Sequence, residues 1–155
     1  MEVYDALQSS QFTVGEIKTR RTSSKPPPPF ITSTLQQQAA NQLGYSTKNT
    51  MRLAQNLYEG VELSEGGSVG LITYMRTDST HLATEAIDGA RDFIGRQYGG
   101  DYLPDKPNHY GTSSKSAQQA HEAIRPTDVN ITPDSVKGDL SPTQLKLYSL
   151  IWGVI

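Results

Sequence analysis

Apolar residues recur at helical spacing in two neighbouring stretches near the start of the chain. In "STLQQQAANQLG" they are Leu35, Ala39 and Leu43, and Gly44 is a typical helix stop. In "STKNTMRLAQNLYEG" the pattern repeats before Gly60, with an expected inner stripe of Met51, Ala54, Leu57 and Tyr58. We therefore predict two helices joined by a short turn. This arrangement is typical of a helix-turn-helix, although ordinary helical hairpins share it.

Residues suited to capping precede both helices. Ser33 and Gln36 form a capping-box pattern for the first, and Ser46 or Thr47 can cap the second. The next segment, "VELSEGGSV", contains adjacent glycines and reads as a loop.

Three more helical patterns follow in the second half of the chain. They are "ATEAIDGARDFIGRQYGG", a short "AQQAHEAI" stopped by Pro126, and "SPTQLKLYSLIWGVI" with Ser141 as cap and Pro142 in the first turn. The expected inward residues are Ala83, Ile87, Ala90, Ile94 and Tyr98 in the first, and Leu145, Tyr148, Ile151 and Trp152 in the last. The sequence thus predicts a mainly α fold: a helix-turn-helix-like, multi-helical domain.

The N-terminal part of the chain has a different pattern. "QFTVGEIKTRR" alternates apolar and polar residues and predicts a strand, and the four prolines of "SSKPPPPF" predict a stiff, extended spacer. We therefore expect residues 1–25 to be a strand and linker, and residues 26–155 to be the helical domain. The unpaired strand and the unfinished apolar run at Ile155 suggest a fragment of a larger protein.

Composition narrows the classes of protein that remain. The 155 residues carry a net charge of −2, so tight autonomous binding to many duplex phosphates is not expected. Cysteine is absent, which rules out disulfides and thiolate metal sites. The sequence contains no apolar run of transmembrane length and no signal-peptide pattern, so we expect a cytoplasmic protein that does not contact membranes.

The stretch "GLITYMRTDST" carries the candidate chemistry. Apolar Leu71 and Ile72 precede Tyr74, as expected of a strand end that presents a phenol. A phenol is a poor nucleophile unless a neighbouring group favours its anion. Arg76 lies two residues along, which on an extended segment is the same face, and a guanidinium also suits a phosphate. Attack by Tyr74 on phosphorus is therefore possible, although most Tyr-x-Arg triplets lie on ordinary surface strands.

"GLITYMRTDST" resembles the active-site tyrosine motif of type IA DNA topoisomerases, and Met75 after the tyrosine is most like the bacterial topoisomerase I branch. "PPFITSTLQQQAANQLGYS", "MRLAQNLYEG", "QQAHEAIRPTDV" and "LYSLIW" resemble the same family in its usual order. The resemblance covers the chain from about Pro26 to its end. It implies that the first strand belongs to a neighbouring arch domain, and that the parent acts in the bacterial nucleoid.

The resemblance also implies roles for individual residues. Tyr74 would attack single-stranded DNA and form a 5′-phosphotyrosine, after which another strand passes and the break is resealed without ATP. The parent would thereby relax negatively supercoiled DNA. Arg76 and His121 would contact the scissile phosphate or neighbouring backbone. Supporting or DNA-contacting positions are implied for Gln55, Glu59, Thr73, Asp78 and Arg125. Without the family, His121 would read as structural or exposed, and Arg125 could simply brace its loop.

The resemblance implies one cofactor, Mg2+, which the acidic toprim domain of the family binds. No Asp-x-Asp-x-Glu cluster occurs in this sequence, so no metal site is expected here and the isolated fragment is expected to be inactive or nearly so. The insertion "GVELSEGGSV" separates Glu59 from Tyr74 more than in short-connection members. Three alternatives remain: a topoisomerase III or reverse gyrase fragment, a helix-turn-helix module that binds DNA without covalent chemistry, and an inert helical scaffold with a chance motif.

Overall fold

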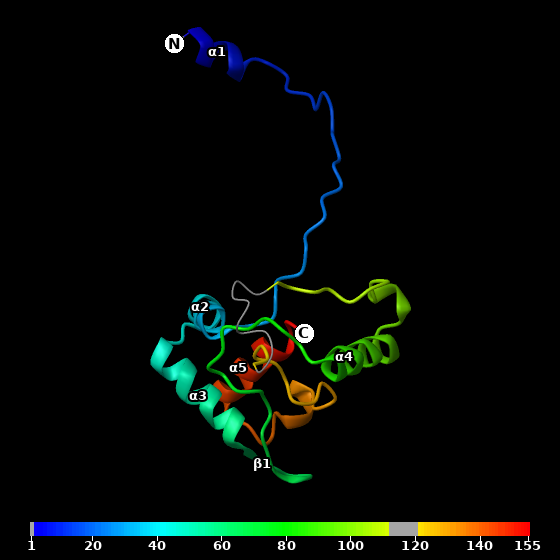
Figure 1. Ribbon diagram of the computed structural model, residues 1–155. Helices are drawn as coiled ribbons and strands as arrows, with labels where there is room; N and C mark the ends of the chain where they lie inside the picture. Colours follow the sequence, from blue (N-terminus) through cyan, green and yellow to red (C-terminus); the bar gives the residue numbers. More distant parts are fainter. Residues whose placement is uncertain (1, 112–120) are drawn as a thin grey trace.

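A computed structural model of the protein describes residues 2–111 and 121–155. Its main body is a cluster of helices. The helices α2 (Thr32–Leu43), α3 (Thr47–Glu59) and α5 (Pro142–Trp152) contact one another, and α4 (Thr84–Gln97) lies on the other side of the body (Figure 1). Short 3-10 turns cover Gly100–Tyr102 and Pro133–Val136. The mainly helical prediction is confirmed.

The helix boundaries follow from local sequence signals. Gly44 adopts a left-handed conformation with φ 69° and ends α2, and the Ser46 hydroxyl accepts a hydrogen bond from the Asn49 amide at the start of α3. Ser141 and Gln144 form a capping box on α5. The predicted Ser33–Gln36 box is wrong, because α2 begins two residues earlier than a Ser33 cap would require, with Ile31 as its N-cap.

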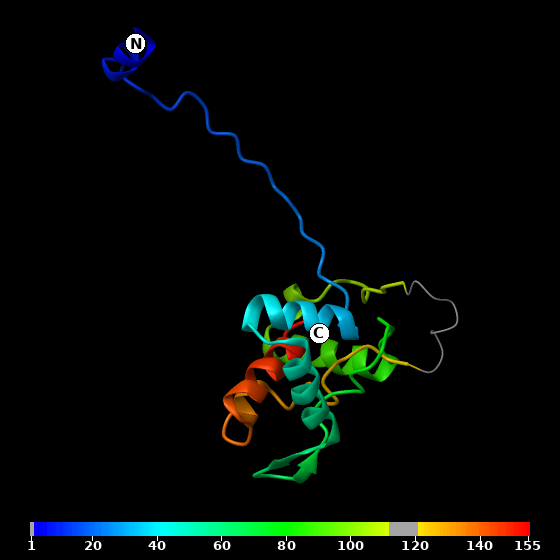
Figure 2. The same cartoon turned by 90° about the vertical axis from the view of Figure 1, so that its left-hand side faces the viewer.

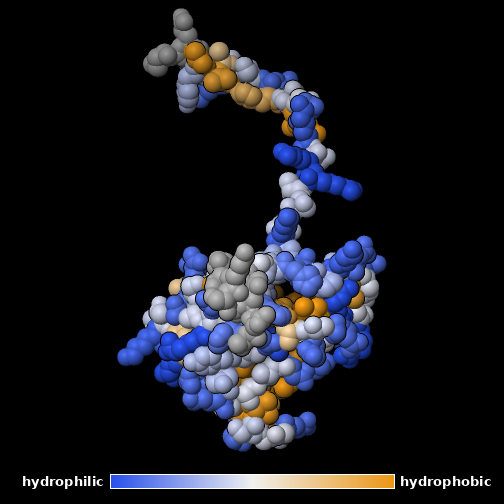
Figure 3. Space-filling model, in the orientation of Figure 1, coloured by the Kyte–Doolittle hydropathy of each residue, from blue (hydrophilic) through white to orange (hydrophobic). Residues whose placement is uncertain are grey.

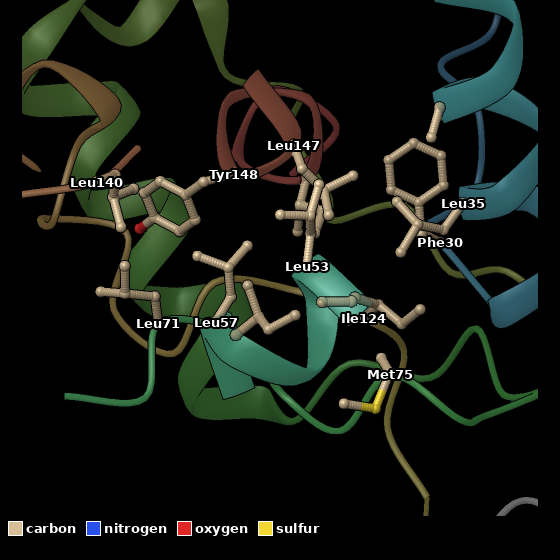
Figure 4. Packing of buried hydrophobic residues seen from close by; sticks show 14 of the residues in the cluster. Phe30, Leu35, Leu53, Leu57, Leu71, Met75, Ile124, Leu140, Leu147 and Tyr148 are labelled. Atoms are coloured by element: carbon tan, nitrogen blue, oxygen red, sulfur yellow. The ribbon is translucent and has the colours of Figure 1, made fainter. Parts of the chain in front are cut away.

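The core forms where α3 and α5 face each other. Leu53 and Leu57 of α3 pack against Leu147 and Tyr148 of α5, and Leu35 of α2 closes one side (Figure 4). The tyrosine segment and the segment after His121 add Leu71, Ile72, Met75 and Ile124 to this core. Burial of apolar area in this cluster therefore holds both segments in place.

Two predicted inward residues are exposed. Tyr58 and Tyr98 have 41% and 55% of their surface accessible, so their assignment to buried stripes is wrong. Each lies near the C-terminal end of its helix, Tyr58 in the last turn of α3 and Tyr98 directly after α4, where the body no longer covers them.

Residues 61–69 form a hairpin, so the prediction of a loop is wrong. Strands β1 (Val61–Leu63) and β2 (Gly67–Val69) pair antiparallel, with Val61 opposite Val69. Gly66 and Gly67 take positive φ values of 114° and 72° at the turn, which glycine adopts readily.

The N-terminal segment lies away from the helical body. Helix α1 (Glu2–Gln8), which the sequence did not predict, is followed by an exposed segment without secondary structure (Figures 1 and 2). The predicted strand at residues 11–21 is not formed, because no described segment pairs with it. Its apolar residues stay exposed, as do those of α1 (Figure 3); they include Val3, Leu7, Phe12, Val14 and Ile17.

The predicted short helix at "AQQAHEAI" lies partly outside the described residues. From His121 to Ile124 the chain forms no helix, so the prediction is wrong there. Ile124 forms a bridge with Phe30 and Pro126 forms one with Ile72, and these pairings replace the helix. Among the helices of the described chain, none is both long and apolar enough to cross a membrane.

Candidate active site

The segment with the candidate nucleophile alternates between buried and exposed side chains. Leu71, Ile72 and Met75 are fully or almost fully buried, whereas Tyr74 keeps 46% of its surface accessible and Arg76 is also exposed. The buried side chain of Met75 therefore holds the segment on the core, and its neighbours Tyr74 and Arg76 point outward. This is the arrangement that the Tyr-x-Arg spacing predicted.

Thr73 connects the tyrosine segment to the segment of His121. Its hydroxyl donates to the Ala123 carbonyl at 2.7 Å and accepts from the Arg125 amide at 2.9 Å. Its own amide donates to the Arg125 carbonyl at 2.9 Å. Thr73 is thus a positioning residue, and its hydroxyl is engaged within the protein.

Thr32 connects the same segment to the start of α2. Its hydroxyl donates to the Met75 carbonyl at 2.7 Å and accepts from the Thr77 amide at 2.9 Å. The Thr32 amide donates to the Thr77 carbonyl at 3.0 Å. Thr32 therefore fixes the backbone on both sides of Arg76. These hydrogen bonds join residues more than forty positions apart, and no sequence pattern indicated them.

Arg125 braces its own loop. The guanidinium forms an ion pair of 2.8 Å with Glu122 and donates to the Pro126 carbonyl at 2.9 Å. The second oxygen of Glu122 accepts from the Ala83 amide at 3.0 Å, next to the start of α4. With all these contacts inside the protein, the bracing interpretation of Arg125 fits the structure better than a direct contact with DNA.

An open hollow of about 460 Å³ brings three of the predicted residues together. Arg76, Asp78 and His121 line it, and its other residues are Ile31, Thr32, Ser33, Gln36 and Thr77. Within the described part of the chain, the Arg76 guanidinium forms no hydrogen bond or ion pair. The hollow thus offers a cation and an imidazole to an incoming anion.

Tyr74 lies beside α3 and contacts Tyr58. The two ring centroids are 5.3 Å apart, and the ring planes are tilted by 60°. One turn before Tyr58, the Gln55 amide donates to the Glu59 carboxylate, so these two predicted residues engage each other. Helical spacing predicted that Tyr58 faces the core. Its position at the end of the apolar stripe, after Ala54 and Leu57, is a signal that could have suggested exposure.

The described residues offer no metal site. Within residues 2–111 and 121–155, no three His, Asp or Glu side chains gather closely enough to hold an ion. The donor set of the described residues therefore does not fit Mg2+.

Comparisons with known proteins give the family. The family model "DNA topoisomerase" matches residues 1–154. The chain belongs to the DNA topoisomerase family. It resembles the bacterial type IA enzymes in particular: DNA topoisomerase 1 of Xylella fastidiosa strain Temecula1 is 53% identical over 139 residues, and that of Campylobacter jejuni is 50% identical over 150 residues. These matches cover 90% and 97% of this chain, but only 17% and 21% of the relatives.

A solved structure extends the comparison to the fold of this topoisomerase chain. Full-length topoisomerase I from Thermotoga maritima superposes with a TM-score of 0.78 at 43% identity, over 97% of this chain and 23% of that one. The chain is thus similar to a limited segment of much longer bacterial topoisomerases. The family resemblance noted in the sequence is confirmed.

Proposed function

We propose that this chain carries the nucleophilic tyrosine of a bacterial topoisomerase I that relaxes negatively supercoiled DNA. The observation that supports this most is the outward position of Tyr74 and Arg76 on either side of the buried Met75, in a chain of this family. A phenol held on a fixed backbone yet open to solvent can meet a DNA strand without rearrangement of the core.

The proposed reaction is a reversible transesterification. The Tyr74 oxygen loses its proton and forms a bond to the phosphorus of a single-stranded DNA backbone. The bond from phosphorus to the 3′-oxygen breaks, and that oxygen gains a proton. The product is a 5′-phosphotyrosine and a free 3′-hydroxyl, which reverses the exchange after another strand has passed. One ester replaces another, so no ATP is needed.

The hollow suggests how the other residues take part. Arg76 would bind the scissile phosphate and stabilise its developing charge, and His121 would contact the same or an adjacent phosphate. Asp78 lines the hollow as a supporting residue. Gln55 and Glu59 would lie at the edge of the DNA path, on the helix beside Tyr74.

The rest of the catalytic centre would come from other domains of the parent. Its toprim domain would hold Mg2+ and face Tyr74, residues 1–25 would belong to its arch domain, and single-stranded DNA in the nucleoid would be the substrate. The helix pair α2–α3 would act as a helix-turn-helix element beside that DNA. We expect the 155-residue chain alone to relax no plasmid in the presence of Mg2+; robust relaxation would contradict this division of the site.

Trapping of the covalent intermediate tests the proposal. The full-length parent is incubated with labelled single-stranded DNA and quenched with denaturant, and the protein–DNA adduct is measured. Tyr74→Phe should abolish the adduct. Tyr98→Phe, a change at another exposed tyrosine, should leave it intact. An adduct that survives Tyr74→Phe would refute the proposal, and a DNA-binding module without covalent chemistry would give no adduct with any variant.

A further inference from the structure

We infer that Tyr58 is a positioning residue that holds the ring of Tyr74 in the orientation for attack. This inference rests on the proposed function of Tyr74. It starts from the contact between the two rings, 5.3 Å apart and tilted by 60°. Aromatic pairs at this distance favour offset or tilted geometries over a face-to-face stack, so the pair gives a preferred orientation to both rings.

The backbone that carries each ring is held in place by contacts other than the contact between the rings. The Leu71 amide donates to the Leu57 carbonyl at 2.7 Å, which joins the last turn of α3 to the tyrosine segment. Gly70 passes so close to α3 that a Cβ there would lie 2.7 Å from the Tyr58 carbonyl oxygen. Leu57 and Leu71 are both fully buried.

With the backbone fixed, rotation about its side-chain bonds is the freedom left to Tyr74. Tyr74 keeps 46% of its surface accessible, so the core does not determine where the hydroxyl points. The neighbouring ring of Tyr58, 5.3 Å away between centroids, restricts the positions that the Tyr74 ring can take. A side chain restricted in this way loses less rotamer entropy when it meets its target.

The contribution of Tyr58 comes from its ring. Within residues 2–111 and 121–155, the Tyr58 hydroxyl forms no hydrogen bond with the protein. Phenylalanine therefore preserves the contact, whereas leucine removes the aromatic pair. An aromatic pair of ordinary strength corresponds to a change of about 2- to 10-fold in a rate constant.

The test uses the full-length parent protein and a labelled single-stranded oligonucleotide. Single-turnover measurements give the first-order rate constant of adduct formation at saturating DNA, and a titration gives the Kd for DNA. We expect Tyr58→Leu to lower the rate constant about 2- to 10-fold with Kd unchanged. Tyr58→Phe should restore most of the rate. Tyr102→Leu, which removes the tilted pair of Tyr98 and Tyr102 at the far end of α4, is the matched control and should behave as wild type.

Each outcome supports or overturns the inference. An unchanged rate constant in Tyr58→Leu refutes it. A weaker Kd at an unchanged rate constant also refutes it, because the ring would then bind DNA and would not orient Tyr74. Melting temperatures of the three variants separate loss of fold from loss of orientation, and Tyr58→Met, which also lacks the ring, replaces Tyr58→Leu if that variant is unstable. If Tyr74→Phe still forms the adduct, the proposed function fails; if only the Tyr58 result fails, the proposed function stands.

Discussion

The Thr73 hydroxyl donates a hydrogen bond of 2.7 Å to the main-chain carbonyl of Ala123, fifty residues along the chain. This contact joins the residue before the candidate nucleophile to the segment that carries His121. The same hydroxyl accepts from the Arg125 amide. One small side chain thus fixes the relative placement of two segments that both contribute to the proposed site.

Replacement of Thr73 by valine should loosen this junction. Valine keeps the shape but leaves the buried Ala123 carbonyl and the Arg125 amide without their partner, so we expect a loss of about 1–3 kcal/mol in the free energy of unfolding. Urea denaturation of the chain measures it. Thr73→Ser retains the hydroxyl and should lose much less. A loss in Thr73→Ser with none in Thr73→Val would show that the methyl group, and not the hydrogen bonds, matters at this position.

Removal of the Arg76 charge should impair cleavage with little effect on folding. The side chain is exposed, so we expect Arg76→Ala to cost about 2–4 kcal/mol in the cleavage barrier of the parent enzyme, as for other lost contacts to a reacting phosphate. The rate of adduct formation measures this. Arg96→Ala removes an exposed arginine that pairs with Asp92 on α4 and should leave cleavage unchanged. Similar rates for the two variants would exclude a role for Arg76 at the phosphate.

A methyl group at Gly70 should destabilise the protein, whereas one at Gly89 should stabilise it. Alanine at Gly70 would place its Cβ 2.7 Å from the Tyr58 carbonyl oxygen, so the backbone must shift, at a cost of about 1–3 kcal/mol in the free energy of unfolding. Gly89 lies within α4 with open space around it, and alanine there should add about 0.5–1 kcal/mol. Urea denaturation compares the two. A neutral Gly70→Ala would mean that the close approach is not required.

Tyr148 should make the protein sensitive to alkali. Burial, with a smaller contribution from the negative charge of Asp128, raises the pKa of Tyr148 well above its ordinary value. Its hydroxyl also donates to the Ile131 carbonyl at 2.6 Å. Above about pH 10 the unfolded chain ionises at this tyrosine while the folded chain does not, so stability falls as pH rises.

The variant Tyr148→Phe isolates this contribution. At neutral pH it should be less stable by about 1–2 kcal/mol, because the Ile131 carbonyl loses its partner. The deficit should shrink as the pH rises beyond about 10, since phenylalanine has no proton to lose. Urea denaturation over a pH series measures both. Parallel stability curves would contradict the assignment.

Those parts of the fold that local signals determine could be predicted from the sequence. Periodicity, the Ser46 and Ser141 caps and the Gly44 stop located α2, α3 and α5. Two of the errors arose where distant pairing decides the structure. Ile124 is extended because it pairs with Phe30, and the strand predicted around Phe12 has no described partner.

The candidate site also combines features set by local sequence with features set by long-range contacts. The outward alternation of Tyr74 and Arg76 around Met75 follows from their spacing, so it could be read directly from the sequence. The contacts of Thr32 and Thr73 join residues more than forty positions apart, and no periodic pattern records them. Tyr58 was misplaced because the end of α3 extends past the core, which helical spacing alone does not reveal.

Because Tyr74 is exposed and Met75 is buried, mutations at these two neighbouring residues should have different effects in the cell. If the proposed function holds, a mutation at an outward residue silences the reaction while the scaffold folds as before, so the cell keeps an inactive protein at its normal level. A mutation at Met75 would instead lower the amount of folded protein.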